Sequence, residues 1–282
     1  MTRDELLPVF ETIKPLPQVA VRILSAVDDE HVATEELAAI VRHDVALHAR
    51  VLKVANSALY GLRTTVDSVD RAITLLGRRT LTKLVISACA GDTLQGGERG
   101  YLLDHGALFR HGMAAGVTCE LLGRHVTLPN PGLLYSACLL QDLGKIALDE
   151  WVASEASGLA HLVAEGVTFV EAESRVLGID HAEVGAWLAE AWEFPESLVD
   201  AIRYHHRPDD ATDPTGPRIV QFCDALCLMA GVGCGCDGLA YAVGPDLAVQ
   251  LGIDEHQVCD IAISLAERLG EIDQLLSETL TA

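Results

Sequence analysis

Basic residues are scarce in this sequence: 20 Lys and Arg stand against 41 Asp and Glu among 282 residues, a formal net charge of −21. A surface that acidic repels phosphate backbones, so direct nucleic-acid binding is disfavoured. The sequence also lacks a positively charged segment followed by a short apolar stretch at its start, and it has no apolar run long enough to span a bilayer. We therefore expect a cytoplasmic protein that binds neither nucleic acid nor a membrane.

Sustained alternation of apolar and polar residues, the pattern of a half-buried β-strand, is missing as well. Apolar residues recur instead at helical spacing along the whole chain. Half of all residues are apolar, which is enough for a large buried core. The predicted fold class is therefore all-α, a multi-helix bundle.

Local signals indicate where several helices begin and end. In the first half, Thr34 is expected to cap one helix, Asp44 to open the next and Gly61 to end it. Gly77 should end a further helix, and another should begin near Thr80. In the second half, five helices are expected. The first lies near residues 105–123, the second begins at Pro131, and the third follows Asp180 as its cap, with Glu183 in the capping-box position. The fourth runs from Pro195 to Pro208, and the fifth follows Pro217.

Charge is distributed unevenly along the chain. Residues 1–95 contain 11 Lys and Arg against 12 Asp and Glu, whereas residues 96–282 contain 9 against 29. The change coincides with the glycine-rich segment 95–100, a composition typical of loops. We predict a domain boundary there, with an N-terminal helical subdomain (1–95) packed on a second helical domain (96–282).

The eight cysteines do not suggest disulfides. Six of them lie in apolar helical runs, where free cysteine behaves as a small hydrophobic residue, so we expect reduced core side chains: Cys89, Cys119, Cys138, Cys223, Cys227 and Cys259. Cys234 and Cys236 flank a glycine and could bind a metal, but no second pair stands at zinc-site spacing. A plain loop is the favoured interpretation of that pair.

Five polar clusters interrupt the apolar helices of the second half. A single His or Asp in such a helix is usually a hydrogen-bonded structural residue. Imidazoles and carboxylates that converge from several helices, however, are what a divalent metal site in a helical bundle needs. The clusters are His111, Gln141-Asp142, His181, His205-His206 and Asp224, whereas His105, His125 and His161 have no comparable setting and are expected at the surface.

The order of these clusters resembles a known superfamily. Residues 141–145, Gln-Asp-Leu-Gly-Lys, are similar to the HD motif, in which a His-Asp pair followed by Gly-Lys supplies metal ligands. The first half resembles the HDOD (HD-related output domain) family, in the segments 14–20, 42–44, 56–61 and 72–77. Together the two resemblances cover nearly the whole chain. They imply an HD-like helical domain and a signalling output module related to metal-dependent phosphohydrolases, generally without demonstrated catalysis.

Gln141 departs from the motif, because a neutral amide stands where the family has an imidazole. This should weaken a metal position that shares His111, Asp142 and Asp224. By resemblance, a second position would keep Asp142, His181, His205 and His206. The resemblance also makes Lys145 a candidate phosphate contact, although a lysine after a helix-ending glycine equally serves as a C-terminal charge.

The leading hypothesis is a non-catalytic regulator of a bacterial type of signalling, whose partners are other signalling proteins. No cofactor is expected, and one divalent ion (Fe, Mn, Zn or Mg) in a residual site is the alternative left open. The competing hypothesis is a metal-dependent phosphohydrolase or phosphodiesterase acting on a nucleotide or cyclic dinucleotide. The Gly-Tyr-Pro segment of the HD-GYP enzymes is absent, since His205-His206 continues as Arg-Pro-Asp-Asp. The sequence specifies neither the upstream signal nor the oligomeric state.

Overall fold

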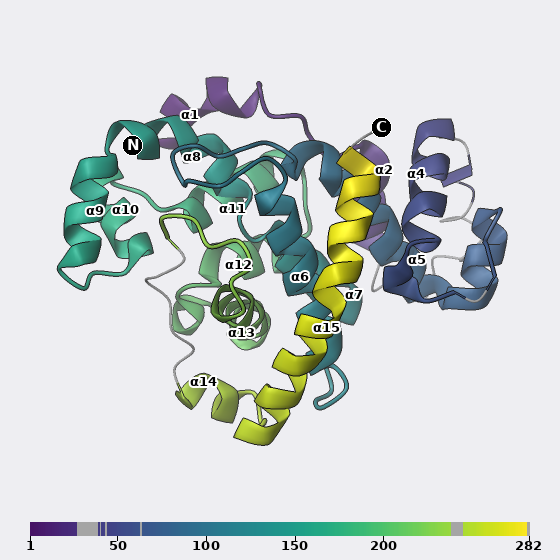
Figure 1. Cartoon of the computed structure of the whole chain (residues 1–282). Coiled ribbons are helices and arrows are strands. Elements are labelled where there is room, and N and C mark those ends of the chain that lie inside the picture. The colour runs from purple at the N-terminus through teal and green to yellow at the C-terminus, as the bar shows by residue number, and fades with distance from the viewer. Residues whose placement is uncertain (27–38, 40, 43, 63, 238–244, 281–282) are drawn as a thin grey trace.

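The computed structural model describes residues 1–26, 39, 41–42, 44–62, 64–237 and 245–280, and all regular elements within them are helices (Figure 1). The all-α prediction is confirmed. In chain order the elements are α1 (Arg3–Phe10), α2 (Gln18–Ala26), α4 (Val45–Ala55), η1 (Ala58–Tyr60), α5 (Val69–Leu94), α6 (Ala107–Leu122), α7 (Pro131–Leu140), α8 (Leu143–Ser154), α9 (Ala156–Ala164), α10 (Phe169–Leu177), α11 (His181–Ala191), α12 (Glu196–Tyr204), η2 (Pro208–Asp210), α13 (Thr215–Met229), α14 (Pro245–Gln250) and α15 (Glu255–Leu280).

The first-half helices begin largely as predicted but end differently. The Asp44 carboxylate accepts a hydrogen bond from the Leu47 amide (2.9 Å) and caps α4. The prediction that Gly61 ends this helix is wrong: α4 stops at Ala55, and Gly61, at φ +57°, closes the short η1 instead. The predicted helix after Thr34 lies outside the described residues.

Gly77 separates two helices, as predicted. Its backbone (φ 80°, ψ 168°) is not helical, and α5 comprises the helices on both sides of this kink. Only glycine adopts such a conformation without strain. From Leu81 to Leu94 most residues of α5 are buried, and this part of the helix packs on α6 and α7 of the second half.

The second-half helices follow their predicted caps with small shifts. Asp180 caps α11 through the Glu183 amide (2.9 Å), and Pro131 begins α7. Pro195 is the cap of α12 and not its first residue, and α12 ends at Tyr204, four residues before Pro208. The α13 helix begins at Thr215, two residues before Pro217, which therefore sits within its first turn.

The helices of residues 1–95 pack on those of the second half. The α5 helix contacts α6 and α7, and α1 lies against α8 and α11. The C-terminal α15 runs beside α6 and reaches η1, as Figure 1 shows. One continuous hydrophobic core includes side chains from both ranges.

No helix among the described residues has the length and apolar character that a membrane crossing requires. The boundary near residue 95 stays a prediction.

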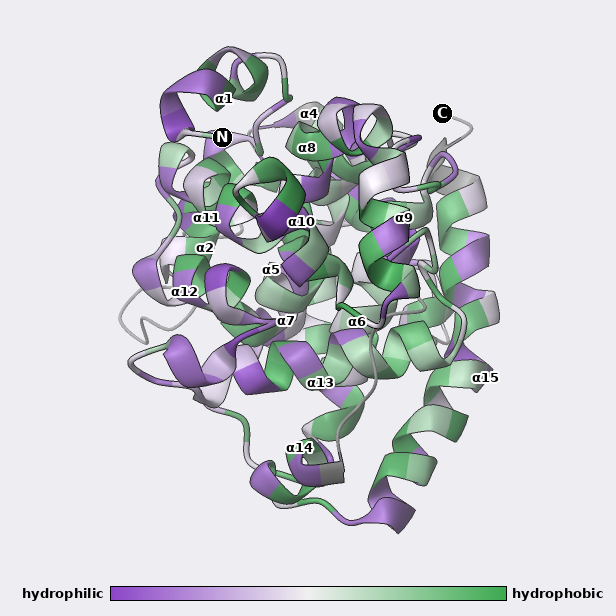
Figure 2. Cartoon of the chain, turned by 90° about the vertical axis from the view of Figure 1, so that its left-hand side faces the viewer, coloured by the Kyte–Doolittle hydropathy of each residue, from purple (hydrophilic) through white to green (hydrophobic). Residues whose placement is uncertain are grey.

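Peripheral helices are amphipathic, whereas the central ones are buried nearly all round. Figure 2 shows both hydrophilic and hydrophobic residues on α12 and α15. On α6 and α7 nearly every side chain is buried, polar ones included.

The prediction that six cysteines are core residues is wrong for one of them. Cys259 is exposed on the amphipathic α15, while the other five predicted core cysteines are buried. All eight cysteines are free thiols, and Cys234 is exposed on its loop.

Candidate metal centre

Every cluster predicted from the sequence reaches the same region of the fold. His111 comes from α6, Asp224 from α13, and Gln141 and Asp142 form the junction of α7 and α8. His181 is the first residue of α11, and His205 and His206 follow the end of α12. These side chains fall into two groups that meet at Asp142, whose Oδ2 lies 3.6 Å from His111 Nε2 and whose Oδ1 lies 3.4 Å from His181 Nε2.

The first group is His111, Asp142 and Asp224, which offer one ligand atom each within 4.8 Å of one another. The Val232 carbonyl accepts a hydrogen bond from His111 Nδ1 (3.0 Å), and His111 Nε2 lies 2.9 Å from Asp224 Oδ1. Burial lowers the pKa of His111, but the Asp224 carboxylate outweighs it and the net effect is a raised pKa. The Asp224 carboxylate thus favours the charged form of this imidazole.

Gln141 enters this first group as a hydrogen-bond donor. Its Nε2 donates to Asp224 Oδ1 (3.0 Å) and lies 3.0 Å from His111 Nε2. A metal here would have to displace the Gln141 amide from His111 Nε2 and Asp224 Oδ1, which weakens this position. His111, Asp142 and Asp224 nevertheless still offer it one ligand atom each.

The second group is His181, His205 and His206, again with one ring nitrogen each within 4.8 Å. Glu173, fully buried, accepts from His181 Nδ1 (2.7 Å) and from the His181 amide (3.1 Å). The Ile202 carbonyl accepts from His205 Nδ1 (2.6 Å), and His205 Nε2 is buried with no hydrogen-bond partner. Carboxylate and carbonyl acceptors on the far nitrogen are how proteins orient metal-binding histidines.

The three imidazoles have different protonation preferences. Burial alone would lower the pKa of His181, but Glu173 raises it to about 9. Burial and the neighbouring His181 lower the pKa of His205, and burial together with His205 and His181 lowers that of His206 further. Neutral imidazole is the form that binds metals, and His205 Nε2 is buried without a hydrogen-bond partner. His181, whose Nε2 lies 3.0 Å from His206 Nε2, would release its proton when an ion binds. With that proton released, the second position fits a divalent ion held by these histidines and Asp142.

Lys145 is buried between two carboxylates. Its Nζ lies 3.0 Å from Asp142 Oδ2 and donates to Asp237 Oδ2 (2.6 Å). Burial lowers the pKa of Lys145, but the two aspartates raise it above its ordinary value, and Lys145 and His111 keep the pKa of Asp142 low against its own burial. The interpretation of Lys145 as a C-terminal helix charge is wrong, because Gly144 and Lys145 lie in the first turn of α8.

Three buried residues of this region had no recognisable signal in the sequence. Asp237 pairs with Lys145 from 92 positions away. Glu173 accepts from His181, and Tyr101 donates to Glu173 Oε1 (2.6 Å). A carboxylate in the amphipathic α10 looks like an ordinary surface residue, so only tertiary contacts identify it. Of the histidines expected at the surface, His105 and His161 are exposed and His125 is half-buried.

The sequence matches one family model. The HDOD domain model covers residues 13–208. A curated relative, an uncharacterized protein of Treponema pallidum (strain Nichols), is 28% identical over 213 residues, which make up 74% of this chain and 40% of the relative. The chain therefore spans well under half the length of that relative.

Solved structures share the fold along almost the whole chain. An HDOD domain protein of unknown function from Geobacter sulfurreducens has a TM-score of 0.76 at 26% identity, with 98% of this chain and 97% of that chain covered. A proposed signal transduction protein from Marinobacter aquaeolei VT8 has a TM-score of 0.73 at 25% identity, covering 98% of this chain and 61% of that one. A proposed phosphohydrolase from Shewanella amazonensis SB2B has a TM-score of 0.69 at 23% identity, over 96% and 97%, a likeness of fold alone.

Proposed function

The chain belongs to the HDOD domain family, and from that premise we propose that it is a non-catalytic signalling output domain that acts through protein partners. The observation that carries the proposal is Gln141. Its amide nitrogen lies 3.0 Å from both His111 Nε2 and Asp224 Oδ1, which are themselves 2.9 Å apart. A hydrogen-bond donor thus stands where a two-metal hydrolase needs its first cation.

The pairing of Lys145 with two buried carboxylates supports the same proposal. A phosphohydrolase needs a cation that is available to the phosphate, yet Lys145 Nζ is buried and held by Asp142 and Asp237. The net charge of the chain is −21, which disfavours approach of a dianionic nucleotide. Both features favour a regulatory role over turnover.

The second position is the part of the site that keeps ligand character. His181, His205 and His206 with Asp142 would hold one divalent ion, and imidazole ligands favour zinc or iron over magnesium. When bound, such an ion polarises a phosphate oxygen and lowers the pKa of a bound water. In the proposed function it serves as a structural tie among α8, α11 and the end of α12.

A metal-dependent phosphohydrolase is the second candidate, favoured by that same three-histidine group. The fold is shared with a proposed phosphohydrolase, and His205 Nε2 is buried without a hydrogen-bond partner. This candidate requires a single ion in the second position to support hydrolysis, because Gln141 stands in the first metal position.

The deciding experiment combines metal analysis with a phosphodiesterase assay on cyclic dinucleotides and on a chromogenic phosphodiester. The variants are Gln141→His, which supplies the missing imidazole, and an Asp142→Ala, His181→Ala double variant. We expect at most one ion per chain in the natural protein and a second in Gln141→His. We also expect no turnover by the natural protein with zinc, iron or manganese.

The exposed His161→Ala serves as the matched control for the loss of an imidazole. Turnover by the natural protein that survives in His161→Ala and disappears in the double variant would establish the phosphohydrolase and overturn the regulatory proposal. An unchanged metal content in Gln141→His would contradict the role given to Gln141.

A further inference from the structure

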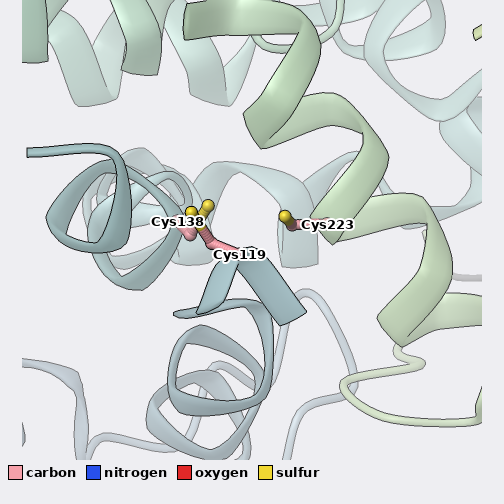
Figure 3. Close-up of side chains that lie close together, drawn as sticks. All are labelled: Cys119, Cys138 and Cys223. Carbon is pink, nitrogen blue, oxygen red and sulfur yellow. The ribbon is translucent and has the colours of Figure 1, made fainter. Parts of the chain in front are cut away.

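A second cluster of potential ligands lies in the core, separate in its chemistry from the histidine and aspartate site. It contains Cys119 from α6, Cys138 from α7 and Cys223 from α13, and Figure 3 shows the three side chains turned toward one another. Their sulfur atoms lie within 4.8 Å of one another, and at most 1% of each residue is exposed. Three helices thus deliver one thiol each to a single buried point.

We propose that Cys119, Cys138 and Cys223 form a three-sulfur site for a thiophilic ion of the trivalent arsenic class. Sulfur is the sole donor type, since no His, Asp or Glu atom of the described residues joins this group. Thiolates are soft ligands and select soft ions over magnesium, calcium or manganese.

The spacing of the sulfur atoms suits a three-coordinate ion. Three sulfurs bound at about 2.3 Å to one central ion lie roughly 4 Å apart or less. The thiols already lie within 4.8 Å of one another, so only small side-chain rotations are needed to close the site. The three helices also hold the sulfurs before any ion arrives: α6 packs directly on both α7 and α13. This lowers the cost of ordering the ligands.

Burial determines which ion the site favours. Three thiolates carry a charge of −3, and an uncompensated charge in the core is costly. Lys83, which acts electrostatically on Cys119, is already paired with Glu120 at 2.6 Å and adds no net positive charge. A trivalent ion gives a neutral complex, whereas a divalent ion leaves −1. The complex of lowest cost is therefore the trivalent one.

The binding reaction is balanced without an oxidant or reductant. Arsenous acid, As(OH)₃, exchanges its three hydroxyl groups for three thiols: three As–S bonds form, three As–O bonds break, and three water molecules leave with the thiol protons. Arsenous acid is uncharged at neutral pH, so it can enter a buried apolar site during local opening without carrying charge into the core. Hydrated zinc lacks that advantage.

Exposed thiols are the main source of competing binding and are removed first. The test uses the full chain with Cys234→Ser, Cys236→Ser and Cys259→Ser as the background, because these three are not buried. Arsenite is added to the reduced protein, and intact-mass spectrometry records the adduct. We expect one arsenic per chain with the loss of three hydrogens, three sulfur neighbours by X-ray absorption, and a raised melting temperature.

Single substitutions in this background identify the ligands. Cys138→Ala and Cys223→Ala should each abolish the three-hydrogen adduct, whereas Cys89→Ala and Cys227→Ala, at buried cysteines outside the group, should retain it. Far-ultraviolet circular dichroism confirms that each variant is folded, and Cys138→Ser replaces any alanine variant that is not. An adduct that persists in Cys138→Ala, or that loses only two hydrogens, overturns the site.

Two further arms test the choice of ion and the independence of the site. Zinc is compared with arsenite after Asp142→Ala and His181→Ala have been added to this background, so that the histidine site does not contribute. Zinc that then binds more tightly than arsenite would overturn the charge argument. The Asp142→Ala, His181→Ala double variant should bind arsenite unchanged, since its substitutions lie outside the sulfur group. The result therefore stands or fails separately from the proposed function.

Discussion

Gly144 lies against the backbone of His181 at the crossing of α8 and α11. A Cβ atom at position 144 would come within 1.9 Å of the His181 carbonyl oxygen and 2.6 Å of the Gly185 amide nitrogen. The glycine of the Gln-Asp-Leu-Gly-Lys segment is thus required by helix packing. The same close approach brings Asp142 Oδ1 within 3.4 Å of His181 Nε2 and so assembles the second metal position.

Gly144→Ala should destabilise the protein by about 3 kcal/mol or more, because neither backbone segment can yield without separating the two helices. Urea unfolding measures the loss. Gly158→Ala is the matched control: its added Cβ meets only Val176 at 3.8 Å on the exposed side of α9, and alanine there should be neutral or stabilising. Equal effects of the two substitutions would contradict the close crossing.

Lys145→Met should cost about 3–5 kcal/mol of unfolding free energy, since it leaves the buried carboxylates of Asp142 and Asp237 without a cation. Adding Asp237→Asn should recover part of the loss, and the double-mutant cycle gives the coupling. The control is Lys83→Met, whose pair with Glu120 is more exposed and should contribute about 1 kcal/mol or less. Strictly additive effects of Lys145→Met and Asp237→Asn would show that the two side chains do not interact.

Tyr101→Phe should destabilise the protein by about 2 kcal/mol, because the buried Glu173 carboxylate loses a charge-assisted hydrogen bond of 2.6 Å. Tyr135→Phe removes a buried hydroxyl that faces the neutral Ser87 at 2.9 Å, and it should cost about 1 kcal/mol. Thermal and urea unfolding of the two variants rank the effects. The reverse order would mean that Tyr101 does not support Glu173.

Glu98 should make stability fall as the pH rises toward neutrality. Burial, reinforced by Asp149, raises its pKa from 4.5 to about 7, and its Oε2 is buried without a hydrogen-bond partner. Between those two values the folded state holds a proton that the unfolded state has lost. The contribution of Glu98 is therefore full below pH 4.5 and declines as the pH rises through 7.

Glu98→Gln should accordingly be more stable than the natural protein at pH 8, by about 2 kcal/mol once partial solvent screening is allowed for, and nearly equal to it at pH 4.5. Urea unfolding at the two pH values measures the difference. Glu150→Gln, at an exposed position on α8, is the matched control for replacing a glutamate by glutamine. A constant difference for Glu98→Gln across the range would exclude a raised pKa at this residue.

The sequence by itself determined the helical class, several helix starts and the family. These follow from short-range physics, because apolar periodicity and caps such as Asp44 and Asp180 act within a few residues of the chain. It predicted helix ends less well. The α4 helix ends at Ala55, and the Asn56 side chain that follows hydrogen-bonds to the Leu52 carbonyl and to both backbone polar groups of Val66. The hydrogen bonds to Val66 span ten residues, a separation that rules for helix caps do not cover.

Tertiary structure alone decided what the site residues do. The sequence identified Gln141 as a departure, but its donation to Asp224, 83 positions away, appears only in the fold. The pairing of Lys145 with Asp237 and the meeting of Cys119, Cys138 and Cys223 have no local signal either. Such contacts depend on how whole helices cross, and helix crossing is fixed by the sum of many side-chain contacts in the core, which no single segment encodes.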